Sequence, residues 1–282
     1  MTVGNSENNA SQGLLLVGSG SRLAKAIVGS WGPELSIDLI SSTELANMSS
    51  PDATKLMLDR SIKSRAIIWL GAILDSTKPP SEIERINFSL PVSSAKALAE
   101  SGYAGRFLTI GSALEDLILD NPYFFWKRRL AVEAENEGLR ALDWTHVRVH
   151  TIVGRQKPRE ASFLGQLVSA LGHSAVFAMH GTKQVRRFQD ETELAKNLIS
   201  EVALRSVETR VVTLGPRESV NLYELASAAA ELSDPPLKIQ VDSSGAWEDD
   251  QTAWRLVNND REIAGGLDIQ AMLKRIREWA EL

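Results

Sequence analysis

The sequence predicts an α/β protein with a doubly wound parallel sheet and a smaller C-terminal lobe. Two observations lead to this fold class. Short, continuous apolar runs alternate with segments of helical spacing, as Gly13 to Val17 does with Arg22 to Trp31. Glycine residues such as Gly18 and Gly71 stop the runs. Apolar runs without alternation are typical of strands in a parallel sheet that helices cover on both faces.

The first part of the chain alternates expected strands with expected helices. The first helix is expected because Leu23, Ala26 and Trp31 share one face, and Gly32-Pro33 ends it. Between residues 41 and 52 the chain is polar and rich in turn formers. The expected strands are 13–17, 35–40, 65–70 and 106–110, and the expected helices are 22–31, 53–62 and 81–101, the last irregular at Pro91.

The alternation of expected strands and helices continues, and it becomes less regular after Gly154. The expected elements are a helix at 122–138, a strand at 144–153, a helix at 162–171, a strand at 176–179, a basic turn at 183–187, a helix at 191–205, a strand at 211–214, a helix at 222–232, a polar stretch after Pro235-Pro236 and an amphipathic helix at 268–282. We expect a main domain of residues 13–154 with strand 211–214 added to its sheet, and a smaller lobe of residues 155–282. Residues 1–12 are polar and are expected to be a disordered leader.

Composition and charge narrow the function classes. A net charge of -5 and a pI of about 5.5 give no overall attraction for nucleic acid or an anionic membrane. The absence of cysteine excludes disulfides and thiolate nucleophiles, and it is compatible with the cytoplasm, the expected location. His146 and His150 lie in an expected strand, so no metal site is expected. No apolar stretch approaches the ~18 residues of a membrane span.

The turn after the first expected strand has the position of a dinucleotide-binding loop. It reads GSGSRLA over residues 18–24 and opens a helix. Backbone N–H groups at a helix N-terminus bind a pyrophosphate, and small residues allow the close approach. On this interpretation, residues 13–154 form a Rossmann domain. The usual last glycine is absent, so an ordinary strand-to-helix turn is the alternative.

The cofactor would be NAD or NADP. An NAD ribose usually pairs with an acid about 20 residues past the turn, and Asp38 stands there but within the expected strand. Ser41 and Ser42 occupy the position just past the strand, and Arg22 is available beside the turn. Because no acid clearly follows the strand, the sequence slightly favours NADP.

Tyr123 and Lys127 carry the clearest catalytic pattern. They stand four residues apart in NPYFFWKRRL, where a helix is expected to begin, so both side chains lie on one helical face. A nearby ammonium favours the phenolate, which makes a tyrosine an effective proton donor and acceptor nearer neutral pH. The alternative is a helical surface with one aromatic residue and a solvated basic run.

These marks occur in the order found in the extended branch of the short-chain dehydrogenase/reductase superfamily, the nucleotide-sugar epimerases, dehydratases and ketoreductases. The chain resembles that family over about residues 13–232. The matching positions are Gly71-Ala72 for the nicotinamide-side turn, Asn87 for the helix-kinking asparagine, Ser112 for the catalytic Ser/Thr, Tyr123 with Lys127 for Y-x-x-x-K, Arg148 with Gly154 for R-P-x-x-V-Y-G-P, and Arg186 for the arginine that binds a sugar nucleotide's phosphate.

The resemblance implies hydride transfer with three catalytic residues. Tyr123 would exchange a proton with the substrate oxygen, Lys127 would lower the pKa of the tyrosine and bond the nicotinamide ribose, and Ser112 would orient the carbonyl or hydroxyl. The expected cofactor contacts are Gly18, Gly20, Ser21, Arg22, Ala24, Ser41, Gly71, Ala72, Asn87 and Lys127. Asn87 has a simpler alternative as a helix cap, and Arg148 is better explained as a structural ion-pair partner.

The expected function is an NAD(P)-dependent epimerase or 4-ketoreductase of a nucleotide-linked sugar. Dehydration is disfavoured, because the family's dehydratases carry Asp-Glu directly after the catalytic residue, whereas Glu115-Asp116 come two residues late. The alternatives are a non-catalytic dinucleotide-binding regulatory or assembly protein, and a reductase of a non-nucleotide carbonyl compound. The apolar face of the closing helix is either core or the contact of a homodimer.

Overall fold

The computed structural model describes residues 13–32, 36–117, 120–173, 176–204, 210–242 and 260–281. The expected leader and Leu35 lie outside these residues. The chain divides into two compact units. The N-terminal unit comprises residues 1–148 and 198–212, and the C-terminal unit comprises residues 149–197 and 213–282.

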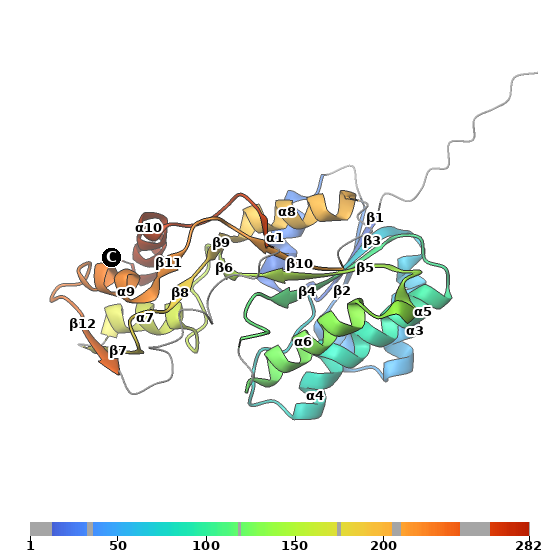
Figure 1. Cartoon of the computed structure of the whole chain (residues 1–282), viewed down its shortest axis with the longest axis horizontal. Coiled ribbons are helices and arrows are strands. Elements are labelled where there is room, and N and C mark those ends of the chain that lie inside the picture. The colour runs from blue at the N-terminus through green and yellow to red at the C-terminus, as the bar shows by residue number, and fades with distance from the viewer. Residues whose placement is uncertain are drawn as a thin grey trace, which may run out of the picture. The chain divides into compact units, whose positions relative to one another are not determined.

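The main sheet is parallel and has seven strands within the described ranges, which confirms the predicted fold class (Figure 1). The strand order is β13-β10-β5-β4-β3-β1-β2. The bounds are β1 (Gly13–Val17), β2 (Ile37–Ile40), β3 (Ser64–Trp69), β4 (Arg106–Ser112), β5 (Asp143–Val149), β10 (Val211–Gly215) and β13 (Asp260–Glu262). As predicted, the strand that begins at Val211 joins this sheet, next to β5.

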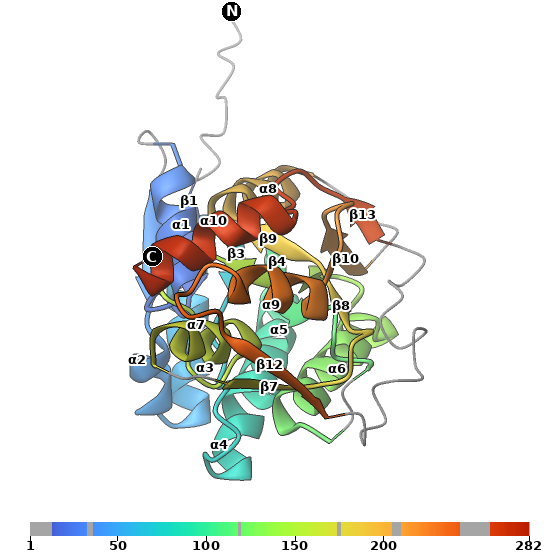
Figure 2. The same cartoon turned by 90° about the vertical axis from the view of Figure 1, so that its left-hand side faces the viewer.

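Helices cover both faces of this sheet in the N-terminal unit. Helices α3 (Ser50–Ser61), α5 (Leu90–Glu100) and α6 (Pro122–Ala134) lie on one face, and α1 (Arg22–Ser30) lies on the other (Figures 1 and 2). The hydrophobic core beneath them includes the large side chains of Trp69, Phe107 and Trp144. Burial on both faces explains why the strands are apolar runs without alternation.

The helix expected at 81–101 is divided into three parts. They are α4 (Pro80–Glu84), the π-helix η1 (Arg85–Ser89) and α5. Pro91 has no N–H and cannot bond the carbonyl of Asn87, while the Leu90 N–H bonds the Arg85 carbonyl instead. The irregularity expected at Pro91 therefore exists, but it begins six residues earlier, at Arg85.

The segment at 41–52 contains a helix that the sequence reading missed. Helix α2 (Ser42–Ala46) follows β2 directly, with Ser41 as its N-cap. A helix of five residues is too short to show a periodic apolar pattern, so the polar sequence of this segment predicted a turn.

The C-terminal unit contains three small two-stranded sheets among its described residues. In these, β6 (Thr151–Val153) pairs with β9 (Phe188–Asp190), β7 (Val176–His180) with β12 (Lys238–Asp242), and β8 (Val185–Arg186) with β11 (Val220–Asn221). Helices α7 (Phe163–His173), α9 (Leu222–Ala230) and α10 (Ile269–Ala280) pack together, and α8 (Glu191–Ala203) runs from this unit into the other. The apolar face of α10 is core, because Met272, Ile276 and Trp279 are buried.

Four further sequence expectations need correction. The strand expected at 144–153 breaks at His150, because β5 joins the main sheet while β6 pairs with β9. The expected basic turn contains the strand β8, and the polar stretch after Pro235-Pro236 contains the strand β12. The helix expected to reach Gly138 ends at Ala134, and a 3-10 turn, η2 (Glu137–Leu139), follows. The break at His150 and the strands β8 and β12 each depend on pairing with another strand. A single sequence does not show which strands pair.

Candidate functional site

The expected pyrophosphate loop lies between β1 and α1 and brings two strand ends close together. Gly18 is buried with φ +91°, and a Cβ built on it would lie 2.5 Å from the Gly71 nitrogen. This contact joins the ends of β1 and β3, two adjacent strands of the sheet. Glycine is therefore required at position 18 for backbone geometry alone.

The rest of the loop has the features of a helix N-terminus that can receive an anion. Ser21 is the N-cap of α1, its hydroxyl accepts a hydrogen bond from the Ala24 N–H at 3.1 Å, and no acidic residue occupies the first turn. Gly20 is exposed, and a Cβ built on it would meet no atom within 4 Å. Arg22 opens the helix directly beside the loop. A pyrophosphate fits here, because the first turn of α1 carries no acidic side chain and Gly20 adds no side chain beside it.

The two glycines give a matched pair of substitutions. We expect Gly18→Ala to destabilise the protein by about 2 kcal/mol or more, because the backbone is left-handed and the Gly71 nitrogen blocks the methyl group. Gly20→Ala should leave the midpoint of urea unfolding within experimental error, yet weaken NAD(P)H binding severalfold if a pyrophosphate approaches this residue. Unchanged binding by a folded Gly20→Ala protein would remove this loop from the cofactor site.

The end of β2 provides no free acid for a ribose. Asp38 pairs with Arg60, with 2.7 Å between carboxylate oxygen and guanidinium nitrogen, on a partly exposed surface. Ser41 caps α2 by accepting from the Glu44 N–H at 3.0 Å. The predicted contact residue Ser41 is thus engaged in a cap, and the sequence preference for NADP rests on the absence of an acid at this strand end.

Asn87 holds the turn after β3. It is fully buried in η1, its side-chain oxygen accepts from the Ile73 N–H at 2.8 Å, and its amide donates to the Ile73 carbonyl at 2.9 Å. The turn that contains Gly71 and Ala72 is therefore fixed to the π-helix. The helix-cap explanation for Asn87 is wrong, because its partners lie in another element.

Ser112 is the last residue of β4, and its immediate surroundings are well ordered by hydrogen bonds. The Ser112 hydroxyl accepts from the Leu114 N–H at 3.2 Å, and the Ser112 N–H donates to the Glu115 carboxylate at 3.0 Å. Ser112 thus stands where the strand turns away from the sheet. Residues 118 and 119, between Ser112 and α6, lie outside the described chain.

Tyr123 and Lys127 lie in the first turns of α6, which Asn121 caps. The Lys127 Nζ lies 5.9 Å from the centre of the Tyr123 ring, and the Lys127 side chain is 1% exposed. Burial lowers the pKa of the Lys127 ammonium to about 8, although the charge of Glu115 acts in the opposite direction. The structure therefore places the phenol of Tyr123 beside a buried ammonium, on one face of α6.

Glu115 and His146 form a buried pair beside Ser112 that was not among the predicted site residues. The Glu115 carboxylate is fully buried and contacts the Arg148 Nε at 2.6 Å and the His146 Nε2 at 3.3 Å. A Cβ on Gly111 would lie 2.5 Å from Glu115 Oε2 and would also collide with His146, so the glycine before Ser112 makes room for this pair. His146 and Arg148 stand two residues apart in a strand, a spacing that places both side chains on one face.

Arg148 is a structural ion-pair partner, as expected. Its Nη2 also lies 2.9 Å from the carboxylate of Asp116. Burial alone would raise the pKa of the Glu115 carboxyl, but His146, Arg148 and the Ser112 N–H more than offset it and hold that pKa below its ordinary value. Both acidic residues, Glu115 and Asp116, thus form ion pairs with Arg148 of β5.

Arg186 belongs to the C-terminal unit. It is the second residue of β8, its Nη1 donates to the Val185 carbonyl at 3.1 Å, and burial lowers its pKa to about 10. A half-buried guanidinium in this setting is suited to a phosphate, because burial strengthens the attraction between opposite charges.

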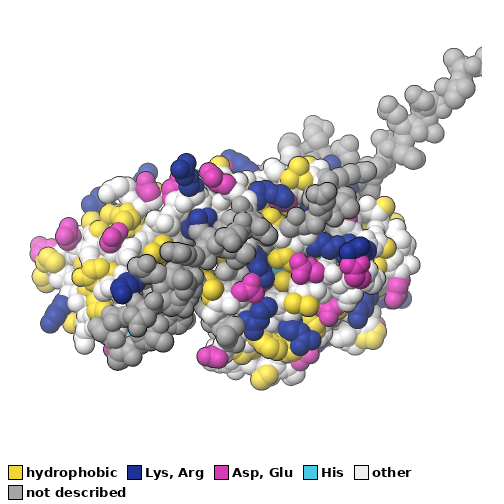
Figure 3. Space-filling model, viewed as in Figure 1, with side chains coloured by type: hydrophobic (Ala, Val, Ile, Leu, Met, Phe, Trp, Pro, Cys, Tyr) yellow, Lys and Arg dark blue, Asp and Glu magenta, His cyan; other side chains and the backbone are white. Residues whose placement is uncertain are grey.

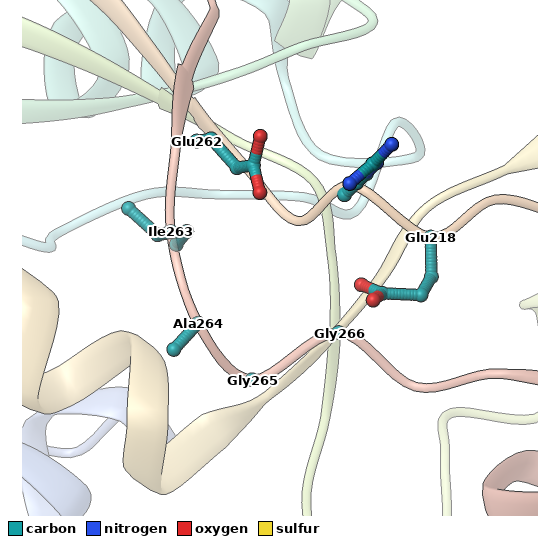
Figure 4. Close-up of a pocket in the computed structure, with 7 residues that line it drawn as sticks. Glu218, Glu262, Ile263, Ala264, Gly265 and Gly266 are labelled. Carbon is teal, nitrogen blue, oxygen red and sulfur yellow. The ribbon is translucent and has the colours of Figure 1, made fainter.

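A separate pocket in the C-terminal unit shares no residue with the predicted site. It is lined by Arg217, Glu218, Glu262, Ile263, Ala264, Gly265 and Gly266 (Figure 4). The Gly265 carbonyl accepts from the Asp190 N–H at 2.9 Å, and Asn197 donates to the Ala264 carbonyl at 3.4 Å. These two hydrogen bonds tie the pocket's loop to β9 and α8.

Among the described residues, no group of three His, Cys, Asp or Glu side chains is placed to hold a metal ion. The helices in the described part of the chain lack the length and hydrophobicity that a membrane-spanning helix needs. On the face shown in Figure 3, the described Lys and Arg side chains are interspersed with Asp and Glu.

Comparison with solved structures identifies the fold. The chain resembles MoeE5 in complex with UDP-glucose and NAD (TM-score 0.66, 16% identity, 94% of this chain and 97% of that chain). It also resembles RMD from Pseudomonas aeruginosa complexed with NADPH (TM-score 0.69, 15% identity, 96% and 99%). A third similar structure is L-threonine dehydrogenase from Clostridium difficile (TM-score 0.66, 11% identity, 96% and 98%).

Sequence comparison adds no closer relative. No family model matches the chain, and no curated protein matches it. The three structures named above are 11–16% identical to this chain, so they establish the architecture alone. The chain has the fold of the extended short-chain dehydrogenases and reductases, as its motifs predicted.

Proposed function

We propose that this protein is an NAD(P)-dependent epimerase or ketoreductase of the short-chain dehydrogenase type that acts on a nucleotide-linked sugar. The observation that carries the proposal is the Tyr123 and Lys127 pair at the start of α6. Lys127 is buried 5.9 Å from the tyrosine ring, on an α/β scaffold that similar enzymes use with NAD or NADPH. A buried lysine is costly to retain unless its charge has a use.

The residues around β1, β3 and α6 fit a nicotinamide dinucleotide. The first turn of α1, from Ser21 to Ala24, would bind the pyrophosphate through backbone N–H groups, with Gly18 and Gly20 allowing its approach. The turn at Gly71-Ala72 and the Lys127 ammonium would lie on the nicotinamide side. The nicotinamide, when bound, supplies or accepts the hydride.

The chain's own residues move the proton and orient the substrate. Tyr123 donates its phenolic proton to a carbonyl oxygen during reduction, or accepts a proton from a hydroxyl during oxidation. Lys127 favours the phenolate by its positive charge, and the Ser112 hydroxyl holds the reacting oxygen. Both epimerisation and net ketoreduction use this proton transfer.

The position of Glu115 supports ketoreduction or epimerisation over dehydration. A dehydratase needs an acid or base beside the substrate carbon in addition to the tyrosine. Glu115 is fully buried against His146 and Arg148, and Asp116 pairs with Arg148. Neither carboxylate is placed as a free acid after the catalytic serine.

The substrate class rests on Arg186 and on the similar structures. Arg186 would bind a diphosphate, and MoeE5 has been solved with UDP-glucose. L-threonine dehydrogenase has a similar fold, which keeps a non-nucleotide carbonyl substrate as the second candidate. The domain division that we propose places the cofactor in residues 13–154 and the sugar nucleotide in the smaller lobe.

Cofactor binding and turnover test the proposed function. We expect NADH or NADPH to bind with a micromolar Kd in a fluorescence titration, and we expect NADPH to bind more tightly. Turnover should appear with nucleotide-linked 4-keto sugars or with UDP-hexoses, and should be absent with nucleotide-free carbonyl compounds.

Each negative outcome of this experiment leads to a different conclusion about the protein. If neither dinucleotide binds, the proposal is wrong. Tight binding without turnover of any sugar nucleotide or simple carbonyl compound would identify a non-catalytic dinucleotide-binding protein. Turnover restricted to nucleotide-free compounds would assign the second substrate class.

A further inference from the structure

A buried polar network lies directly behind Ser112, and the proposed catalytic roles do not use it. The Trp144 Nε1–H donates to the Thr109 hydroxyl at 3.0 Å, and that hydroxyl lies 3.0 Å from the His146 Nδ1. His146 Nε2 in turn faces the Glu115 carboxylate. All four side chains are nearly inaccessible to solvent. Buried polar groups cost free energy unless they are paired. The pairing in this network therefore depends on a specific arrangement of strands β4 and β5.

Glu115 is the residue at which this network meets the catalytic turn. One carboxylate oxygen accepts from the Ser112 N–H at 3.0 Å, and the other accepts from the Arg148 Nε at 2.6 Å. The carboxylate therefore ties the backbone of Ser112 to β5. A carboxylate that accepts charge-assisted hydrogen bonds in the interior holds its partners in a narrow range of positions.

The same residue is connected to the helix that carries Tyr123 and Lys127. The Arg128 Nη1 donates to the Glu115 main-chain carbonyl at 2.9 Å, which links α6 to the turn after β4. The Glu115 charge also acts on Lys127, where it opposes the effect of burial on the pKa of the ammonium. Glu115 is thus bonded to the strand end with Ser112 and to the helix with the other two residues.

We propose that Glu115 is a positioning residue whose buried carboxylate, held by His146 and Arg148, fixes Ser112 relative to α6 and supplies the negative charge that balances Lys127. This inference rests on the proposed function, because it assigns the support for that same site. Misplacement of a reacting group by about 1 Å can lower a rate by about 100-fold, so positional support of this kind has a measurable effect.

The neighbouring carboxylate provides a matched control. Asp116 pairs with the same arginine at 2.9 Å, but its side chain is 43% exposed. The Ser112 N–H donates to the Glu115 carboxylate at 3.0 Å, so Glu115 is the acid that is bonded to the backbone of the catalytic turn. Replacing either residue by its amide removes one negative charge next to Arg148 at nearly constant shape.

The decisive comparison is Glu115→Gln against Asp116→Asn. We expect Glu115→Gln to lower kcat by about 10- to 100-fold with the Kd for NAD(P)H within about twofold of the wild-type value. Asp116→Asn should keep kcat within about twofold, because an exposed ion pair contributes little. An active Glu115→Gln enzyme with unchanged kcat would overturn the proposal.

A second readout does not depend on turnover. The pKa of Lys127, followed by NMR of ¹³C-labelled lysine side chains, should fall in Glu115→Gln and stay unchanged in Asp116→Asn. Tyr123 lies beside Lys127 on α6, and the charge of Glu115 acts on the ammonium; Glu115 itself contacts His146, Arg148 and Arg128. An unchanged Lys127 pKa in Glu115→Gln would contradict the charge role even if the proposed reaction were never observed.

A surface-side variant covers the case in which Glu115→Gln does not fold. Arg128→Gln removes the link between α6 and the Glu115 carbonyl and leaves the buried network intact. It should lower kcat by about 3- to 10-fold, with cofactor binding unchanged. A folded Arg128→Gln enzyme with wild-type kcat would show that the turn and α6 need no such connection.

Discussion

Replacement of Tyr123 by phenylalanine is expected to lower kcat by about 10²- to 10⁴-fold, the usual contribution of a positioned general acid or base. The substitution removes one oxygen and keeps the ring, so the packing of Tyr123 against Phe124 should persist, with ring centres 5.0 Å apart. The Kd for NAD(P)H should change by less than about twofold. The test compares the initial rates of the two proteins at saturating cofactor, with whichever nucleotide-linked 4-keto sugar or UDP-hexose the wild type turns over fastest.

Tyr223 supplies the control for this substitution. It lies on α9 and its side chain is 37% exposed, so Tyr223→Phe should leave both kcat and cofactor affinity unchanged. If Tyr123→Phe turned over at the wild-type rate, the tyrosine would not be the proton donor. The proposal of short-chain dehydrogenase chemistry would then fail even if the cofactor bound.

Much of the main sheet could be predicted from the sequence because its strands are buried on both faces. The runs at 13–17 and 65–70 needed no partner information, since a parallel strand inside two helical layers is apolar throughout. The small sheets of the C-terminal unit were different. Strands such as β8 and β12 are short or half exposed, and they exist because β11 and β7 pair with them.

The candidate site divides in the same way. Tyr123 and Lys127 could be predicted because a helix places residues i and i+4 on one face, which is a local rule. Ser112 could be placed because it ends an apolar run. Glu115 could not be assigned its role, because its partners His146 and Arg148 come more than 30 residues later and belong to another strand. The sequence did contain one sign of the contact, the i and i+2 spacing of those two residues in β5.

Replacement of Lys127 by methionine should lower the activity and raise the stability of the protein. We expect Lys127→Met to abolish most turnover and yet to increase the free energy of unfolding at pH 7 by about 1–3 kcal/mol. The reason is that burial lowers the pKa of Lys127 from 10.5 to about 8, so the charged form is disfavoured in the folded protein. Methionine has similar length and carries no charge to desolvate.

The sign of the pH dependence follows from the direction of this shift. Below pH 8 lysine is charged in both the folded and the unfolded chain, and the folded state bears the full cost of the buried charge. Between about pH 8 and 10.5 the folded protein has released the proton while the unfolded chain still binds it, so wild-type stability rises with pH. The stability advantage of Lys127→Met should therefore shrink between pH 7 and pH 10 in urea unfolding experiments.

An exposed lysine separates this effect from a general response to losing a positive charge. Lys157 lies 3.4 Å from Glu281, and its side chain is 59% exposed, so Lys157→Met should change stability by less than about 0.5 kcal/mol at either pH. If Lys127→Met were instead less stable than the wild type at pH 7, the buried ammonium would be a net stabilising group, held by Glu115. Packing and charge balance alone would then explain the lysine at this position, without a catalytic role.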